Sequence, residues 1–348
     1  MERVVQFTAP RQVEVAEHES APLPPGHLRV RTRYSGISAG TELTAYRGTN
    51  PYLTRSWDPE ARLFREDAAG LSYPVAGWGY SEVGEVTEVS PELAGTPGLP
   101  AVGDQVWGIW GHRSEGVVPA ERLTGHTLPA GLDPLAGSFA RVGAIAYNAV
   151  LAAGIHVGED VAVFGQGVIG LLATRLAALS GATVTAVDAL DARLERAREH
   201  GAARTLNARA GGVAEEIRAA ANGRGADVAI EISGAYAALH EAVRSVVVDG
   251  RVVAAGFYQG DAVGLRLGDE FHHNRVRLVC SQIGGVPPEL AGRWDQQRLQ
   301  QTFLRLVAEG RVEVLPLVSH VVPADAAADA YALLDERPEA ALQVVLEF

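Results

Sequence analysis

The fold is decided by the segment Gly165-Gln166-Gly167-Val168-Ile169-Gly170, which follows the short apolar run Val161-Ala162-Val163-Phe164. This run predicts a buried strand, and the alanine-rich segment Leu171–Leu179 predicts a helix. In a strand–turn–helix unit, the first glycine permits a tight turn, the second lets the backbone approach a pyrophosphate, and the third lets the helix pack closely on the strand. A helix N-terminus also favours anionic phosphates. The segment therefore predicts the phosphate-binding turn of a dinucleotide site.

An acidic residue stands where such a site needs one. The second predicted strand, Thr183–Val187, is followed by Asp188, about 20 residues beyond the glycines. A carboxylate at this position accepts hydrogen bonds from both ribose hydroxyls, whereas a 2′-phosphate would meet its negative charge. The sequence therefore predicts NAD rather than NADP as the cofactor. Arg193, on the predicted helix Asp191–Ala197, is expected on the adenine side of the site.

Strands continue to alternate with helices up to Cys280, which is typical of an α/β fold with a doubly wound parallel sheet. The predicted strands are Val228–Ile232, Arg251–Ala255 and Val276–Cys280, with a helix at Tyr236–Val246. The residues that follow the first two of these strands are expected beside the nicotinamide, namely Ser233, Gly234, Gly256 and Phe257. The C-terminal segment is predicted to hold a helix at Trp294–Glu309, a strand at Leu315–Val321 and an alanine-rich helix.

The first 150 residues are β-rich and irregular. Leu28–Tyr34 and Val83–Val89 alternate apolar and polar side chains, as half-buried strands do. Residues 47–72 are polar and aromatic without a clear period, and because an uncovered loop of that length is often functional, we predict a substrate-side lid. The predicted organisation is a catalytic domain at 1–150, a dinucleotide-binding domain at 151–285, and a segment at 286–348 that returns to the catalytic domain.

Composition excludes several classes of function. All 30 basic residues are arginine, which excludes lysine-dependent chemistry such as Schiff-base formation. The net charge of −12 makes a nucleic-acid partner unexpected, and the single cysteine, Cys280, excludes a disulfide framework or a cysteine-rich zinc knuckle. The N-terminus lacks the apolar core of a signal peptide, and polar residues and glycines interrupt the most apolar region, Val161–Val187. We therefore expect a soluble, cytoplasmic protein with no membrane partner.

Three further motifs resemble those of the medium-chain dehydrogenase/reductase superfamily, and the resemblance covers essentially the whole chain. Val102–Gly108 resembles the family's Gly-Asp-x-Val turn. Ala39–Glu42 and Gly79–Val86 resemble the stretches that supply the first two zinc ligands in its zinc-dependent members. The resemblance implies an N-terminal chaperonin-10-like β-rich catalytic domain plus a Rossmann doubly wound parallel sheet, with the active site in the cleft between the domains. It also implies a homodimer or a dimer of dimers, paired through an edge strand around Val276–Cys280.

The zinc ligands of that family are replaced in this sequence. Ala39 stands in place of the cysteine ligand, Tyr80 in place of the histidine and Ser81 in place of the neighbouring glutamate. A further ligand region contains Arg141, which cannot bind a cation, and the four-cysteine lobe of many relatives is missing. A catalytic zinc needs three protein ligands, so the sequence predicts no metal and a zinc-independent branch. Ser35–Glu42 resembles the group related to the bacteriochlorophyllide hydroxyethyl dehydrogenases.

Hydrogen-bond donors must then stabilise the alkoxide-like oxygen that zinc would otherwise polarise. We expect Tyr80 and Thr41 to supply these donors, with His112 as a proton source of ordinary pKa. A hydrogen-bonded loop residue is an equal alternative for His112. His272 and His273 are poor partners for one metal ion, because neighbours on a strand point to opposite faces.

The function predicted from these residues is a zinc-independent, NAD(H)-dependent oxidoreductase that interconverts an alcohol and a ketone or aldehyde by hydride transfer. Its partner would be a small-molecule alcohol or carbonyl substrate. Two alternatives stay open: an NAD(P)H-dependent reductase of an activated double bond, of enoyl or quinone type, and a non-catalytic NAD-binding protein. Retained NAD binding without turnover would distinguish the non-catalytic protein from both enzymes.

Overall fold

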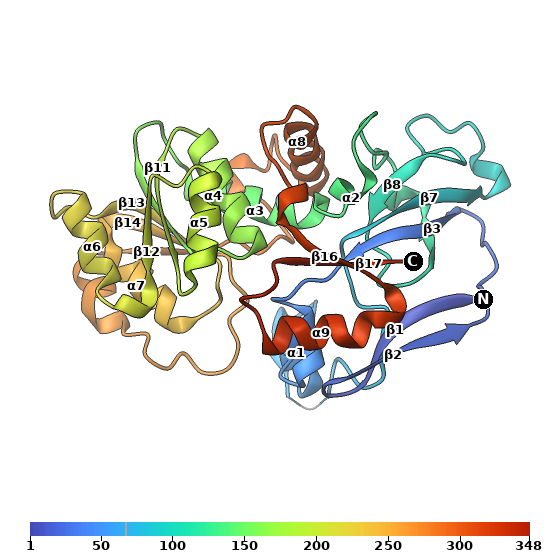
Figure 1. Ribbon diagram of the computed structural model, residues 1–348, viewed down its shortest axis with the longest axis horizontal. Helices are drawn as coiled ribbons and strands as arrows, with labels where there is room; N and C mark the ends of the chain where they lie inside the picture. The colour runs from blue at the N-terminus through green and yellow to red at the C-terminus, as the bar shows by residue number, and fades with distance from the viewer. Residues whose placement is uncertain (67) are drawn as a thin grey trace. The chain divides into compact units, whose positions relative to one another are not determined.

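The chain divides into two units in the computed structural model, which describes residues 1–66 and 68–348. Unit 1 comprises Met1–Arg141 and Val307–Phe348, and unit 2 comprises Val142–Leu306 (Figure 1). Asp67, which falls within the predicted lid, lies outside the described residues.

The boundaries of unit 2 differ from those predicted after residues 150 and 285. The difference arises because most of helix α3 (Ala140–Ala153) and helix α8 (Gln296–Ala308) belong to unit 2. A Cβ atom at Gly143 on α3 would lie 2.2 Å from the ring of Phe303 on α8, so the two helices pack in direct contact. The buried ring of Phe303 thereby joins the segment after residue 285 to the core of unit 2.

Unit 2 is built on a six-stranded parallel sheet, which confirms the predicted doubly wound α/β fold. The strand order is β12-β11-β10-β13-β14-β15, so the order reverses between β10 and β13. In open α/β sheets, ligands bind beyond the carboxyl ends of the strands at such a reversal. The strands are β10 (Asp160–Phe164), β11 (Thr183–Asp188), β12 (Arg204–Asn207), β13 (Ala226–Glu231), β14 (Val246–Ala254) and β15 (Arg277–Cys280).

The helices between these strands confirm most of the sequence predictions. They are α4 (Val168–Leu179), α5 (Asp191–Glu199), α6 (Val213–Ala220) and α7 (Tyr236–Ser245). Helix α4 begins inside the glycine segment, before the predicted start at Leu171. Strand β12 and helix α6 are absent from the sequence prediction. Strand β12 is an edge strand whose four residues are all half-buried, so it shows no alternation to detect.

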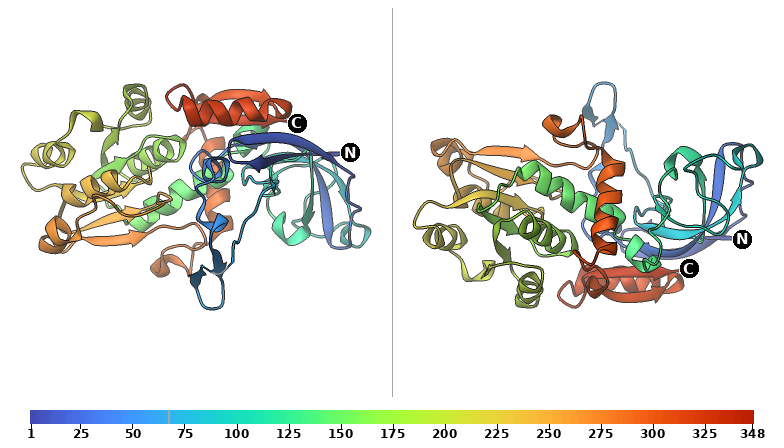
Figure 2. Two further views of the ribbon diagram at one scale, coloured as in Figure 1. Left: turned by 90° about the horizontal axis from the view of Figure 1, so that it is seen from below. Right: turned by 90° about the horizontal axis from the view of Figure 1, so that it is seen from above.

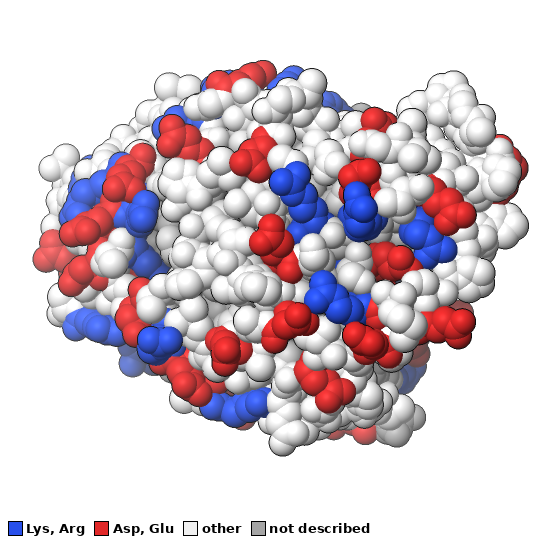
Figure 3. All heavy atoms as spheres, turned by 45° about the vertical axis from the view of Figure 1, so that its right-hand side comes forward, with Lys and Arg blue, Asp and Glu red and all other residues white. Residues whose placement is uncertain are grey.

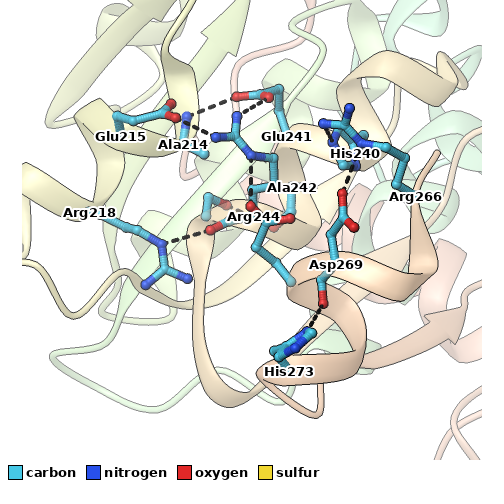
Figure 4. Close-up of polar contacts among 12 residues, drawn as sticks. Ala214, Glu215, Arg218, His240, Glu241, Ala242, Arg244, Arg266, Asp269 and His273 are labelled. Carbon is cyan, nitrogen blue, oxygen red and sulfur yellow. Dashed lines mark hydrogen bonds and ion pairs between the residues drawn. The ribbon is translucent and has the colours of Figure 1, made fainter. Parts of the chain in front are cut away.

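One arginine ties three helical segments of unit 2 together. The guanidinium of Arg244 on α7 pairs with Glu241 on the same helix, Glu215 on α6, and Glu270 on the turn η5 (Leu267–Phe271) (Figure 4). The Arg244 side chain is only 23% exposed, so water screens these pairs incompletely. Arg218 on α6 also donates from Nε to the carbonyl oxygen of Arg244 at 2.8 Å. We therefore expect Arg244 to stabilise the contact between α6, α7 and η5.

Replacing Arg244 with methionine should lower the free energy of unfolding by about 2 kcal/mol, because it removes three partly shielded ion pairs together. Urea or thermal unfolding of the unmodified protein and the variant measures the difference. Arg31→Met is the control, since the Arg31 side chain is 66% exposed and its pair with Glu85 should contribute less than about 0.5 kcal/mol. Equal losses for the two variants would contradict the role assigned to Arg244.

Unit 1 is β-rich, as predicted, and contains two larger sheets. The first has the order β16-β17-β3-β7-β8, with β9 also paired to β3, and the second has the order β2-β1-β6. Strands β3 and β7 contain the two alternating segments that the sequence predicts. The strands are β1 (Glu2–Ala9), β2 (Gln12–His18), β3 (His27–Gly36), β6 (Val75–Ala76), β7 (Glu82–Val89), β8 (Gln105–Gly108), β9 (Glu115–Pro119), β16 (Val318–Pro323) and β17 (Gln343–Glu347).

The C-terminal segment of unit 1 adds two strands and a helix. The predicted strand at Leu315–Val321 is a 3-10 turn, η7 (Leu315–Leu317), followed by β16. Strand β17 is absent from the prediction, because four consecutive buried residues give no alternation. The alanine-rich helix α9 (Ala327–Glu336) lies beside α1 (Glu42–Arg47), far from it in sequence (Figure 1). This contact brings Tyr331 of α9 to Glu42 of α1.

The predicted description of residues 47–72 as an uncovered loop is wrong. The segment contains a two-stranded hairpin of β4 (Ser56–Asp58) and β5 (Leu63–Arg65), which projects from unit 1 in both views of Figure 2. The rings of Trp57 and Phe64 pack at 5.3 Å between centroids while both stay about 40% exposed. A projecting hairpin has no buried face, so its sequence lacks the alternation of a core strand. A role of this hairpin towards substrate stays a prediction.

Charged side chains of both signs are interspersed on the face shown in Figure 3, with no continuous basic stripe. Nucleic-acid-binding proteins typically cluster arginine and lysine on one face. Among the described residues, no helix combines the length and apolar character that crossing a membrane requires.

Candidate active site

The glycine segment forms the turn between β10 and α4 in unit 2. Gly165 has a φ of +88°, which residues with a side chain rarely adopt. A Cβ atom at Gly170 would lie 1.7 Å from the carbonyl oxygen of Gly165, so the helix can approach the strand only with glycine there. Gly167, the N-cap of α4, has no protein atom within 4 Å of a Cβ position. Protein atoms therefore crowd Gly165 and Gly170, whereas there is free space beside Gly167, just before the first helical residues, Val168 and Ile169.

Asp188 is the last residue of β11 and is hydrogen-bonded to the glycine turn. Its Oδ2 accepts from the backbone amide of Gln166 at 2.6 Å, and its Oδ1 accepts from the amide of Leu190 at 2.9 Å. The residue is 8% exposed. Each carboxylate oxygen can accept two hydrogen bonds, so these contacts use half of its capacity. Arg193 follows five residues later in the sequence, in the first turn of α5.

A buried carboxylate that the sequence analysis missed organises the residues beyond β13. Glu231 is the last residue of that strand, and it accepts from the amides of Ser233 at 2.8 Å and Gly234 at 3.2 Å. Tyr258, which follows β14, donates its hydroxyl to the same carboxylate. Burial raises the pKa of Glu231, while these hydrogen bonds oppose the rise. An acid placed two residues before Ser-Gly at a strand end is the signal that could have revealed it.

The four predicted neighbours of the nicotinamide lie together in unit 2. A Cβ atom at Gly256 would lie 2.4 Å from the amide nitrogen of Gly234, so the two loops touch through their backbones. A Cβ atom at Gly234 would lie 3.0 Å from the carbonyl oxygen of Phe257. The loop that begins at Ser233 also borders the glycine turn, since a Cβ atom at Gly165 would lie 2.9 Å from Ser233. The residues assigned to cofactor binding thus converge at the point where the strand order reverses.

In unit 1, three hydroxyl groups meet in what we name the hydroxyl cluster: Tyr80, Ser38 and Thr41. The hydroxyl of Tyr80 forms hydrogen bonds with the side chains of Ser38 and Thr41. Thr41 is the residue that precedes helix α1. Burial raises the pKa of Tyr80, and the two hydrogen bonds oppose that rise. The structure therefore brings the predicted pair Tyr80 and Thr41 together, and it adds Ser38, which as a lone loop serine gave no signal.

Of the two alternatives for His112, the structure favours the hydrogen-bonded loop residue over the proton source of ordinary pKa, because the side chain is buried. It is 1% exposed, and both ring nitrogens are occupied: Nε2 bonds to Glu42 Oε2 at 2.7 Å and Nδ1 to Ser35 Oγ at 2.6 Å. Burial alone would lower its pKa, but the charge and hydrogen bond of Glu42 and the charge of Glu82 raise it on balance. His112 therefore sits in a buried ionic network behind the hydroxyl cluster.

The residues at the zinc-ligand positions do not form a zinc site. Ala39 is exposed and offers no donor atom, Tyr80 is engaged in the hydroxyl cluster, and Arg141 brings a positive charge next to Tyr80. Within residues 1–66 and 68–348, no group of three His, Cys, Asp or Glu side chains is arranged to hold a metal ion. This donor set does not fit zinc.

The prediction that His272 and His273 lie on a strand is wrong. Both lie in the helical turn that follows η5, and their rings contact edge-on at 5.4 Å between centroids. His273 Nδ1 bonds to the carbonyl oxygen of Asp269 at 3.0 Å. The pair therefore belongs to the η5 region of unit 2, where Figure 4 shows His273 beside Asp269.

Comparison with known proteins agrees with the fold. Residues 168–301 match the family model described as zinc-binding dehydrogenase. The D-guloside 3-dehydrogenase of Escherichia coli K12 is 29% identical to this chain over 98% of both chains. A candidate zinc-binding dehydrogenase of Sinorhizobium meliloti 1021 bound to NADP shares the fold with a TM-score of 0.80, at 23% identity over 100% of this chain and 99% of that one.

An alcohol dehydrogenase of Escherichia coli CFT073 in complex with NADH also shares the fold, with a TM-score of 0.78 at 20% identity over 100% of this chain and 99% of that one. These matches support the resemblance to the medium-chain dehydrogenase/reductase superfamily. Its relatives by sequence are named dehydrogenases, which supports an oxidoreductase. The narrower resemblance to the bacteriochlorophyllide hydroxyethyl dehydrogenase group stays a prediction.

Proposed function

We propose that this protein is a zinc-independent, NAD(H)-dependent oxidoreductase that interconverts a secondary alcohol and a ketone by hydride transfer. The observation that carries the proposal is the hydroxyl cluster, which stands where zinc-dependent members of the superfamily hold a metal ligand. A preorganised donor aimed at a developing alkoxide can replace the charge stabilisation that a metal supplies.

The residues at the reversal of strand order in unit 2 fit a dinucleotide. The open side of the turn at Gly167 and the first amides of α4 would receive the pyrophosphate. Asp188 would accept from the adenosine ribose hydroxyls, and Ser233 and Gly256 belong to the loops on the nicotinamide side. When bound, NAD supplies the hydride acceptor, and the protein's part is orientation and charge.

The preference for NAD rests on Asp188. A 2′-phosphate would bring negative charge against this carboxylate, which two backbone amides hold in place. Solved neighbours of the same fold hold either NADP or NADH, so the fold itself does not choose between them.

Replacing Asp188 with alanine should weaken NADH binding by at least about 10-fold, since a charged acceptor of two ribose hydrogen bonds is lost. NADPH binding should improve, and calorimetric titration with each cofactor measures both changes. Asp191→Ala is the control. Asp191 is the first residue of α5, and its carboxylate accepts a hydrogen bond from Asn207 Nδ2 at 2.7 Å, so it is not assigned to the ribose. Tighter binding of NADPH than NADH by the unmodified protein would refute the assignment.

On the substrate side, Tyr80 would donate its hydroxyl proton to the carbonyl oxygen as hydride adds in the reducing direction. Thr41 bonds to Tyr80 and is partly exposed, so it offers a route by which that proton is restored from water. Arg141 adds a positive charge near the same phenol and would favour the developing alkoxide. In the oxidising direction the same groups take the alcohol proton in reverse.

For the substrate class we start from a relative that aligns over 98% of both chains and is named D-guloside 3-dehydrogenase. We infer a sugar or polyol whose ring or chain carries a secondary hydroxyl. The direct test is NADH formation from NAD with a panel of glycosides and polyols. Turnover with none of them, together with turnover of an enone and NADPH, would favour the double-bond reductase instead.

The quaternary structure that fits this proposal is a homodimer or a dimer of dimers. Strand β15 ends the described sheet of unit 2, and its Leu278 is 39% exposed. An uncovered edge of this kind is a template for pairing with another strand. Light scattering on the purified protein measures the state directly.

A further inference from the structure

A single buried carboxylate lies behind the hydroxyl cluster. Glu42 is the first residue of α1 and is 1% exposed. Its Oε1 accepts from the backbone amide of Ser38 at 2.8 Å, and its own amide donates to the carbonyl oxygen of Ser38 at 2.9 Å. Its Oε2 accepts from His112 and from the hydroxyl of Tyr331 on α9, the latter at 2.5 Å. Side chains from distant parts of the sequence therefore converge on this carboxylate.

His112 balances the charge of Glu42. Ser35 donates its only hydroxyl proton to Glu82 Oε1 at 3.0 Å, so it accepts from His112 Nδ1. The other ring nitrogen of His112 faces Glu42, which leaves both nitrogens as donors and the imidazole positively charged. A buried charge is tolerated when it is paired and hydrogen-bonded, as it is here. The network therefore holds the Glu42 side chain in a fixed position in the interior of unit 1.

Ser38 joins this network to Tyr80 through two different groups. Its backbone amide bonds to Glu42, while its side-chain hydroxyl bonds to Tyr80. An amide does not exchange its proton along such a chain, so the path from Tyr80 to Glu42 cannot relay a proton. Glu42 can therefore affect Tyr80 only by fixing its position and through its electric field. The turn at Ser38 is fixed by Glu42, and the orientation of the Tyr80 hydroxyl is fixed by that turn.

We infer that Glu42 is a positioning residue for the Tyr80 hydroxyl, held in place by His112 and Tyr331 and acting through the turn at Ser38. The inference rests on the proposed role of Tyr80 as the donor to substrate. The matched family model covers residues 168–301 and does not include Glu42.

The groups that face Tyr80 act on its pKa, so the inference can be tested by titrating Tyr80. Burial and the charge of Glu42 raise the pKa of Tyr80, whereas the hydrogen bonds from Ser38 and Thr41 and the charge of Arg141 lower it. Behind Glu42 stand the charged groups of His112 and Glu82. Removing the charge of Glu42 should therefore make Tyr80 ionise at lower pH. Removing the hydroxyl of Ser38 should make it ionise at higher pH.

The experiment compares Glu42→Gln and Ser38→Ala by the ultraviolet absorbance of tyrosinate during alkaline titration of the full-length protein. Subtracting the titration of Tyr80→Phe isolates Tyr80 from the other eight of the 9 tyrosines. We expect shifts in opposite directions, a fall in kcat of about 10-fold in each variant, and unchanged NADH affinity. A generally loosened structure would not move the two titrations in opposite directions.

Ser38→Ala keeps every buried charge, so it provides a result even if Glu42→Gln fails to fold. An unshifted Tyr80 titration in Ser38→Ala, or shifts of the same sign in both variants, would overturn the inference. Failure of the proposed function gives a different result. In that case the titrations shift as expected, while Tyr80→Phe retains full turnover.

Discussion

The Gly170→Ala variant should lose most of its NADH affinity, by about 100-fold or more, and about 3 kcal/mol of stability. The new Cβ atom would lie 1.7 Å from the carbonyl oxygen of Gly165, and this neighbour is backbone rather than a flexible side chain. Helix α4 must therefore move away from β10, which displaces the first amides of the helix from the glycine turn. Calorimetric titration with NADH and thermal unfolding measure the two effects.

Gly167→Ala is the matched control in the same turn. A Cβ atom there meets no protein atom within 4 Å, and the φ of −71° suits alanine, so the variant should unfold at the temperature of the unmodified protein. Its NADH affinity should still fall, because the open space beside Gly167 is where the pyrophosphate would lie. If Gly167→Ala binds NADH normally, the cofactor does not use this turn.

The contrast between these glycines also shows what the sequence could predict. The turn, its flanking strand and helix, and the acid at the end of the next strand are local features, set by residues a few positions apart. Local spacing determines local geometry, so the glycine motif with its flanking strand and helix predicts the turn, and the alternation of strands with helices predicts the parallel sheet. Strand β17 escaped prediction because burial on both faces removes the alternation that marks a strand.

The ionic network behind Tyr80 could not be predicted in the same way. Glu42, His112 and Tyr331 come from α1, from the segment between β8 and β9, and from α9. Only the packing of α9 against α1 brings the tyrosine hydroxyl to the carboxylate. Sequence reasoning assigned Tyr80 and Thr41 the same donor role from the motifs that contain them, and the structure brings their side chains into contact. Sequence reasoning left two alternatives open for His112, since nothing local marks a histidine as buried against a distant carboxylate.

Replacing Tyr80 with phenylalanine should lower kcat by about 100-fold, as expected when a donor to the developing alkoxide is removed. NADH affinity should not change, because the residues assigned to the cofactor all belong to unit 2 and Tyr80 belongs to unit 1. The phenyl ring keeps the packing of the tyrosine, and the bond lost is the one that links the hydroxyl to Ser38 and Thr41. Steady-state kinetics with NAD and the best alcohol of the substrate panel measures the effect.

Tyr34→Phe supplies the control, since the Tyr34 ring contacts the guanidinium of Arg33 in the same unit and lies outside the hydroxyl cluster. Elemental analysis of the same preparations should find no stoichiometric zinc, and chelators should leave turnover unchanged, because Ala39, Tyr80 and Arg141 offer no ligand set. Full turnover in Tyr80→Phe would show that the tyrosine only fills the space of the missing ligand. The polarising charge would then have to come from Arg141, whose guanidinium already acts on the Tyr80 phenol and would remain beside the substrate oxygen.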